Sequence, residues 1–273
     1  MYNSPHIDPY LRTIEYEYGI NIIGAWDRGS RAWNLHTDES DYDIRICFTQ
    51  PHSNYLTLTQ YTSSIQSRGD KLNDTTIPSD IPADKIEFQG WDIKRFLELL
   101  TDNNPSIYEC LASPITYQHH PIFDDISEYC LNRIHYIELW KHYLSATKSN
   151  YHKYILGGKD LSAKRNLFIL RNMLCAEYIK NTHEYPTIDF DTLLEESPED
   201  SFRSIPKTEY QELAELKRSG EGNKEIGNKY QSGIEEFLQQ DFDYESHIPE
   251  QTIQSEDLDE YLSRLIQSTT LFL

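Results

Sequence analysis

The sequence predicts an N-terminal α/β domain followed by a C-terminal helical domain. Up to residue 104, short apolar runs alternate with segments of helical period, as in domains whose strands and helices alternate along the chain. Beyond residue 105, almost all of the periodicity is helical. We therefore expect an α/β domain over residues 1–104 and a helical domain over residues 105–273.

In the N-terminal domain, apolar period and turn signals separate helices from strands. Helix candidates are Tyr10–Tyr18, the short segment Ser30–Leu35 and the amphipathic segment Ile93–Leu100. Strand candidates are Ile20–Trp26, Asp41–Phe48, Tyr61–Ile65 and Lys85–Phe88.

The C-terminal domain is expected to begin at a helix start. Asn104 suits the cap position and Pro105 suits the first turn, because proline has no N–H to lose there. Three long stretches of helical period follow, at Ile122–Thr147, Ala163–Asn181 and Thr208–Gln240. Three prolines indicate a loop region between the last two stretches, at Pro186, Pro198 and Pro206.

The composition is that of a folded protein, with 38% hydrophobic and 26% charged residues. The N-terminus lacks the apolar core of a signal peptide, and no run reaches the roughly 18 apolar residues of a membrane span. The four cysteines form no CxxC pair, so neither a zinc ribbon nor a disulfide framework is predicted. We therefore expect a cytoplasmic protein without a membrane partner.

The charge balance is strongly acidic, with 45 acidic against 25 basic residues and a formal net charge of −20. Such a chain repels phosphate backbones, so a broad nucleic-acid-binding surface is disfavoured, although a local basic groove could hold a nucleic-acid end. An acidic surface is found both in ordinary cytoplasmic proteins and in proteins adapted to high salt, where screening removes the self-repulsion. The composition leaves both interpretations open.

A phosphate-binding turn is predicted where the first strand candidate ends. Gly29 permits close approach of the backbone to a phosphate, because it has no side chain. Ser30 adds a hydroxyl donor, and Arg31 can form a charge-assisted bond to a phosphate. A helix starting at Ser30 would add free N–H groups and the positive end of its dipole.

Two aspartates at the start of the next strand candidate predict a metal site. Asp41 and Asp43 are two residues apart, so their side chains leave the same face of a strand, roughly 6.5–7 Å apart. Carboxylates at that spacing can converge on two divalent ions roughly 3.5–4 Å apart. Oxygen ligands and phosphate substrates favour Mg²⁺, with Mn²⁺ as the alternative.

A third carboxylate is expected to complete the site, and two residues compete for this role. Glu87 lies between Ile86 and Phe88, as an acid projecting from a buried strand would. Asp92 is the alternative, but it precedes the helix candidate Ile93–Leu100 and can act as its N-cap. We favour Glu87 as the third metal ligand.

These motifs resemble those of the RlaP family, the RNA-ligase-associated nucleotidyltransferases of the polymerase-β superfamily. The segment GSRAWNLHTDESDYDIR closely resembles the family motif GSRAWG…SDYDVR. Further similar segments are Gly90-Trp91-Asp92-Ile93-Lys94, Asn104-Pro105-Ser106-Ile107-Tyr108-Glu109, Ser113-Pro114-Ile115 and the helix candidate from Lys164 to Arg171, so that the resemblance spans residues 20–195.

The resemblance implies an α+β (or α/β) polymerase-β-like nucleotidyltransferase domain with a mixed sheet, followed by a helical domain. It also implies Asp41, Asp43 and Glu87 as catalytic metal ligands. The departures are mild: Asn34 stands where the family often has glycine, Glu87 where it has aspartate, and Asn172 follows Arg171 in place of proline. The longer side chain of Glu87 puts only the third ligand in doubt.

With this resemblance, two cations of the helical domain become candidates for nucleotide binding. Lys164 and Arg171 are seven residues apart and fall on one helix face, where they could contact a triphosphate. The alternative is a solvated basic stripe, in which ion pairs contribute less than about 1 kcal/mol. In either case, replacing one of them by alanine is expected to change the melting temperature little.

The predicted function is transfer of a nucleoside monophosphate from an NTP to a hydroxyl acceptor, with release of pyrophosphate. The acceptor could be an RNA end, a protein side chain or a small molecule, and the fold does not choose among them. The alternative is a nucleotide-binding regulator or toxin–antitoxin component without turnover. The intact set of Gly29, Ser30, Asp41 and Asp43 favours the enzyme.

Overall fold

The computed structural model describes residues 6–72, 77, 79–240 and 252–269. The chain forms two compact units. Unit 1 comprises Met1–Ala32, Ser40–Arg133 and Ile253–Leu273, and unit 2 comprises Trp33–Glu39 and Ile134–Thr252. This division differs from the expected one after residue 104, because residues 105–133 belong to unit 1 and the chain returns to it near the C-terminus.

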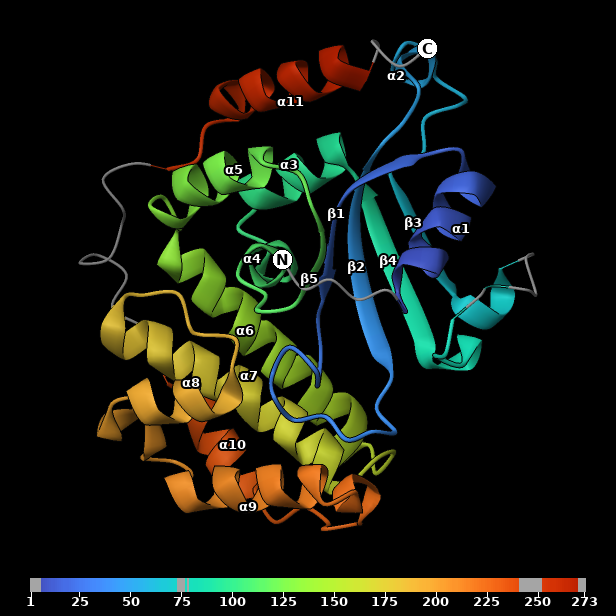
Figure 1. Ribbon diagram of the computed structural model, residues 1–273. Helices are drawn as coiled ribbons and strands as arrows, with labels where there is room; N and C mark the ends of the chain where they lie inside the picture. The colour runs from blue at the N-terminus through green and yellow to red at the C-terminus, as the bar shows by residue number, and fades with distance from the viewer. Residues whose placement is uncertain (1–5, 73–76, 78, 241–251, 270–273) are drawn as a thin grey trace. The chain divides into compact units, whose positions relative to one another are not determined.

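Unit 1 is built on a mixed five-stranded sheet (Figure 1). Its strands are β1 (Asn21–Asp27), β2 (Tyr42–Thr49), β3 (Ser64–Arg68), β4 (Ile86–Asp92) and β5 (Thr116–His119), in the order β3-β4-β2-β1-β5. Strands β2 and β4 pair in parallel, and the other neighbours are antiparallel. The expected α+β fold with a mixed sheet is confirmed.

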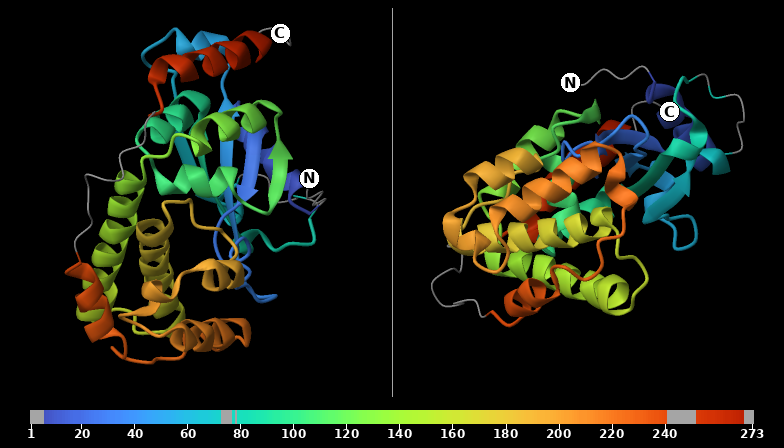
Figure 2. Two further views of the ribbon diagram at one scale, coloured as in Figure 1. Left: turned by 90° about the vertical axis from the view of Figure 1, so that its left-hand side faces the viewer. Right: turned by 90° about the horizontal axis from the view of Figure 1, so that it is seen from below.

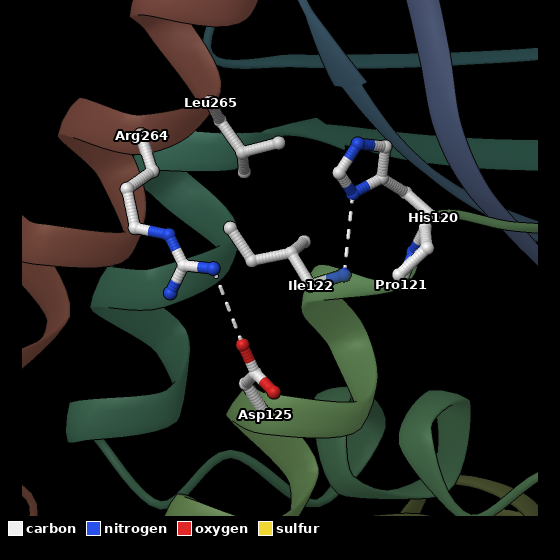
Figure 3. A pocket seen from close by; sticks show the side chains of 6 residues that line it. All are labelled: His120, Pro121, Ile122, Asp125, Arg264 and Leu265. Atoms are coloured by element: carbon white, nitrogen blue, oxygen red, sulfur yellow. Dashed lines mark hydrogen bonds and ion pairs between the residues drawn. The ribbon is translucent and has the colours of Figure 1, made fainter.

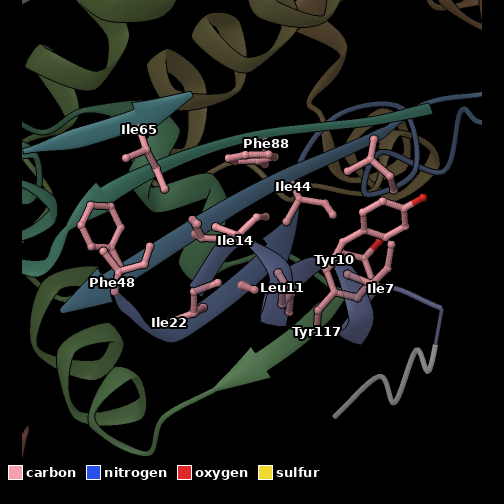
Figure 4. Packing of buried hydrophobic residues seen from close by; sticks show 14 of the residues in the cluster. Ile7, Tyr10, Leu11, Ile14, Ile22, Ile44, Phe48, Ile65, Phe88 and Tyr117 are labelled. Carbon is pink, nitrogen blue, oxygen red and sulfur yellow. The ribbon is translucent and has the colours of Figure 1, made fainter. Parts of the chain in front are cut away.

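Helix α1 (Asp8–Tyr18) covers one face of this sheet. Its apolar residues Tyr10, Leu11 and Ile14 pack with the inward side chains of β2 and β4, as Figure 4 shows. The alternation of buried Ile44, Ile46 and Phe48 along β2 places the intervening residues on the opposite face. The core thus determines which face of β2 carries Asp43.

The opposite face is covered by α3 (Ile93–Thr101), α4 (Pro105–Leu111) and α5 (Ile122–Leu131). Trp26 of β1 stacks on Phe96 of α3 at 5.8 Å between ring centroids and meets Phe123 of α5 edge-on at 5.0 Å. The cap predicted at Asn104 is confirmed, because its side chain accepts a hydrogen bond from the Ser106 N–H. Unit 1 also contains the short helix α2 (His52–Tyr55) and the helix α11 (Ser255–Thr269).

A small pocket lies between α11 and the start of α5 (Figure 3). Arg264 is 3.4 Å from Asp125 across it, and the His120 ring accepts a hydrogen bond from the Ile122 N–H. The lining residues are His120, Pro121, Ile122, Asp125, Arg264 and Leu265. The His120 N–H donates to the Ile23 carbonyl, so the pocket adjoins the start of β1 and not its end.

Unit 2 is helical. Its helices are α6 (Tyr136–Asn150), α7 (Ala163–Thr182), α8 (Phe190–Glu196), α9 (Lys207–Arg218) and α10 (Gln231–Leu238). Helices α6 and α7 run side by side (Figure 2), joined through a π-helical turn, Tyr151–Leu156. In neither unit is a described helix long and apolar enough to cross a membrane.

Four local predictions were wrong. Residues 30–34 form turns and not a helix, with Asn34 at a positive φ of 59°, a conformation that glycine and asparagine tolerate best. This explains how Asn34 can stand where the family often has glycine. The segment Ile122–Thr147 is split into α5 and α6, and Thr208–Gln240 into α9 and α10. Strand β5 was missed, because its apolar content is low.

Candidate active site

The turn after β1 packs directly against the start of β2. Gly29 has a φ of 137°, and a Cβ atom at this position would lie 2.2 Å from an Oδ atom of Asp43. The Arg28 N–H donates to the Asp43 carbonyl at 2.8 Å. Gly29 is therefore required both for its backbone conformation and for the space that the Asp43 carboxylate occupies.

We predict that Gly29→Ala lowers the specificity constant for nucleotide transfer on the order of a hundredfold, because the methyl group displaces the Asp43 carboxylate. Gly19→Ala is the matched control: Gly19 also has a positive φ, of 60°, but an added Cβ would meet nothing within 4 Å. Steady-state kinetics of both variants compare a substitution beside Asp43 with the same substitution at a positive-φ glycine that has open space around it. Equal activities of the two variants would contradict the prediction.

Asp43 and Glu87 lie side by side on paired strands. In the parallel register of β2 and β4, Asp43 is opposite Glu87, so both side chains leave the same face. Burial raises the pKa of Asp43; Arg45 acts against this, and Glu87 and Asp41 raise that pKa further. Asp41 is exposed and stands one residue before β2. The structure thus places Asp43 beside Glu87 at one end of the sheet, with Asp41 two residues before Asp43 along the chain.

Asp92 has a different surrounding. It is fully buried at the other end of β4, opposite Phe48, and its carboxylate accepts a hydrogen bond from the Lys94 N–H at the start of α3. The same carboxylate accepts bonds from Tyr55, Tyr61 and Gln50. The N-cap role of Asp92 is confirmed, and the parallel register places Glu87, not Asp92, beside Asp43.

Arg31 holds the segment that leads into β2. Its guanidinium donates to the carbonyls of Ser40 at 2.8 Å and Asp41 at 3.3 Å, and lies 3.7 Å from the centroid of the Tyr42 ring. These contacts position the two residues around Asp41. Arg31 therefore orients the segment that carries Asp41, and its predicted contact to a phosphate stays a prediction.

Two arginines near Asp43 were not among the predicted site residues. Arg45 follows Asp41 and Asp43 in the same alternation along β2, so its side chain leaves the same face. Arg28 forms an ion pair with Glu109 of α4, whose side chain is only 3% exposed. Burial lowers the pKa of Arg45, and the neighbouring Arg28 lowers it further. The D-Y-D-I-R alternation was a signal that could have identified Arg45.

The end of β1 is hydrogen-bonded to β5, which was not predicted, and to the segment before it. Asp27 donates its N–H to the Ile115 carbonyl, and the Ser113 hydroxyl donates to the Asp27 carbonyl at 2.7 Å. Tyr117 of β5 donates its hydroxyl to the Asp27 carboxylate, and burial raises the pKa of that carboxyl to about 7. The Ser113-Pro114-Ile115 segment therefore anchors the strand that presents Gly29.

Arg171 and Lys164 do not share an exposed stripe. Lys164 is exposed at the start of α7, whereas Arg171 is 1% exposed and its guanidinium lies 4.2 Å from the Trp33 ring centroid. Phe168 packs on the same ring at 5.8 Å. The solvated-stripe alternative is wrong for Arg171, because Trp33 covers that face of α7. The spacing of residues along the helix does not reveal this contact with a distant segment.

We predict that Arg171→Ala lowers the free energy of unfolding by about 2–3 kcal/mol, because it removes a desolvated cation–π contact and buried packing. This corrects the small change in melting temperature expected from sequence alone. Lys164→Ala, at the exposed start of the same helix, is the control and should leave the melting temperature unchanged. Thermal unfolding of both proteins decides this, and equal melting temperatures would refute it.

The residues present fit a magnesium site. Asp43 and Glu87 offer paired oxygen ligands, and their mutual repulsion is the kind that a divalent cation relieves. Among the described residues, no group of three or more histidine, cysteine, aspartate or glutamate side chains could hold a metal by itself. The protein would supply part of the coordination shell, as is usual for magnesium, which retains waters and substrate phosphates.

Comparison with known proteins identifies a family for the chain. The profile of RlaP, described as "RNA repair pathway DNA polymerase beta family", matches residues 4–266. The chain belongs to the RlaP family. This membership supports a nucleotidyl-transfer role for the protein.

Two individual proteins are similar to this RlaP family member. "Uncharacterized protein YcgL" of Bacillus subtilis (strain 168) is 28% identical over 220 residues, which cover 77% of this chain and 75% of that protein. A nucleotidyltransferase-like protein from Exiguobacterium sibiricum 255-15, known from a crystal structure, is 12% identical with a TM-score of 0.30 and covers 85% of this chain and 74% of its own.

Proposed function

We propose that this protein transfers a nucleoside monophosphate from an NTP to a hydroxyl acceptor in a magnesium-dependent reaction that releases pyrophosphate. The observation that carries the proposal is the pairing of Asp43 with Glu87 across β2 and β4, with Gly29 packed against the Asp43 carboxylate. The two carboxylates repel each other, and a bound divalent cation would relieve this repulsion in addition to the neighbouring Arg45.

Asp41, Asp43 and Glu87 would hold magnesium, with two ions expected and manganese as a substitute. When bound, the metal lowers the pKa of the attacking hydroxyl and neutralises charge on the α-phosphoryl group and the departing pyrophosphate. Arg31 keeps Asp41 in place through the Ser40 and Asp41 carbonyls. The chain's own contribution is thus to orient the carboxylates and to hold them close together.

Phosphate recognition would fall to the Gly29–Ser30 turn and to Arg45. Arg45 is balanced in this structure by Asp43 and Glu87, which raise its pKa against the effects of burial and of Arg28. With Asp43 and Glu87 engaged by a cation, the Arg45 guanidinium would be available to bind the triphosphate of the NTP. Lys164 stays a further candidate for nucleotide binding, to be tested by the NTP dissociation constant of Lys164→Ala.

An RNA end is the acceptor that we favour. The family is described by an RNA repair pathway, and a terminal ribose hydroxyl is a suitable nucleophile for nucleotidyl transfer. A protein side chain or a small molecule would use the same carboxylates, so the choice rests on the family description and not on the site.

The experiment is incubation of the protein with each α-labelled NTP, magnesium and a defined RNA that has a free 3′ hydroxyl. We expect label on the RNA together with pyrophosphate release, both lost when magnesium is chelated. In a parallel incubation with cell lysate, label on a protein or a small molecule would show that this molecule, and not RNA, is the acceptor. Tight NTP binding without transfer to any of these would favour the nucleotide-binding regulator.

A further inference from the structure

Unit 2 contains a basic segment within an otherwise acidic chain. Residues 148–165 hold five of the 25 lysine and arginine residues but only one of the 45 acidic residues, Asp160. Elsewhere in the chain acidic residues outnumber basic ones by more than two to one. Because the Debye length is only about 8–10 Å at physiological salt, such a local cluster can attract an anion despite the net charge of −20.

Two cations of this segment, Lys153 and Arg165, contact one aromatic ring. The Arg165 Cζ atom lies 3.8 Å from the ring centroid of Tyr154, and the Lys153 Nζ atom lies 4.8 Å from it. Lys159 donates its N–H to the Tyr154 carbonyl at 3.0 Å, and both lysine side chains are exposed. We call the surface formed by Lys153, Tyr154, Lys159 and Arg165 the Tyr154 surface.

The backbone at this place is unusual as well. Tyr154 lies in the π-helical turn Tyr151–Leu156 between α6 and α7. Such turns are rare and frequently occur at functional sites, because they cost stability relative to a regular helix. The turn is held in place by Tyr151, which is buried and donates its hydroxyl to Glu235.

Neighbouring acids do not cancel the positive charge. Asp160 is paired with Arg165 at 3.0 Å. The adjoining segment 221–225 brings Glu221, which is 3.6 Å from Lys224, and Glu225, and α10 brings Glu235 beside Tyr151. Residues 148–165 and 221–225 together hold six lysines and arginines against these four acids, and Lys153 and Lys159 carry the excess at the surface.

We propose that the Tyr154 surface binds the phosphate backbone of a single-stranded RNA end. Exposed lysines suit phosphates, and an arginine beside a tyrosine ring suits the faces of unstacked bases, the combination that single-strand-binding proteins use. The small footprint favours a single strand over the long duplex contacts that the acidic chain disfavours. The inference rests on the proposed function in taking RNA as the acceptor.

The test is binding of a fluorescein-labelled single-stranded RNA of about 20 nucleotides, followed by anisotropy without NTP at roughly 50 to 200 mM salt. The variant Lys153→Glu/Lys159→Glu should bind at least about tenfold more weakly, with a salt slope smaller by about 1.4, since each single-strand phosphate contact contributes about 0.7. Lys71→Glu/Lys94→Glu, two exposed lysines of unit 1 with the same change in net charge, is the matched control and should retain wild-type affinity.

Equal weakening of both double variants would show an effect of net charge alone and overturn the proposal. Absence of binding by the wild-type protein at low salt would also overturn it. So would tighter binding of a labelled polyglutamate peptide with the same sensitivity to the lysine changes, which would indicate an acidic protein partner. RNA binding that depends on these lysines but without any transfer would refute the proposed function and leave this surface in place.

Discussion

Asp43→Asn is expected to reduce nucleotide transfer by on the order of a thousandfold, the scale seen when a group that stabilises developing charge is removed. Asp41→Asn should have a similar effect, because both carboxylates are expected to hold the metal. The structure singles out Asp43, since its carboxylate contacts the Gly29 turn and faces Glu87. The measurement is the rate of label transfer from an α-labelled NTP at saturating magnesium.

Asp43→Asn should leave the free energy of unfolding unchanged or slightly higher. Burial, Glu87 and Asp41 raise the pKa of Asp43 in the folded state above its ordinary value, in spite of Arg45. An acid whose folded pKa is raised destabilises the fold once pH rises above its unfolded pKa, because the charged form is disfavoured in the folded protein. Asparagine removes that cost at neutral pH, so activity and melting temperature should not fall together.

Asp84→Asn, at an exposed carboxylate in the short turn before β4, is the control and should change neither quantity. Near-wild-type transfer by Asp43→Asn on an identified acceptor would refute the metal assignment. A large drop in its melting temperature would instead show that Asp43 is a structural residue.

Glu87→Gln and Asp92→Asn are expected to have opposite effects. Glu87→Gln should lose activity on the order of a hundredfold or more with little change in melting temperature, because Glu87 lies beside Asp43 and is only partly buried. Asp92→Asn should lose at least about 2 kcal/mol of unfolding free energy, since Tyr55 and Gln50 both donate to one carboxylate oxygen and an amide nitrogen there could not accept.

Transfer assays and thermal unfolding of the two proteins in parallel separate these roles. For a protein of this size each kcal/mol corresponds to roughly 2–4 °C in melting temperature, so the Asp92→Asn shift should be measurable. A stable but inactive Asp92→Asn protein beside an active Glu87→Gln protein would reverse the assignment of the third carboxylate.

Local pattern was sufficient for the elements that build the site. The apolar runs of β1 and β2 and the cap at Asn104 are determined by neighbouring residues, so periodicity and capping rules identify them. The glycine turn at Gly29-Ser30 and the paired aspartates Asp41 and Asp43 could be predicted for the same reason. The turn conformation of residues 30–34 could not be predicted, because its hydrogen-bond partners lie in other parts of the chain.

Local sequence pattern was enough to predict the glycine turn at Gly29 and the placement of Asp41 and Asp43 at the start of the second strand. The neighbour of Asp43 depends on tertiary contacts, because the parallel pairing of β2 with β4 joins residues 44 positions apart and no local pattern encodes it. The burial of Arg171 against Trp33 and the ion pair between Arg28 and Glu109 likewise depend on contacts between distant segments. Periodicity shows which face of an element is apolar, but the partner of that face depends on how distant segments pack.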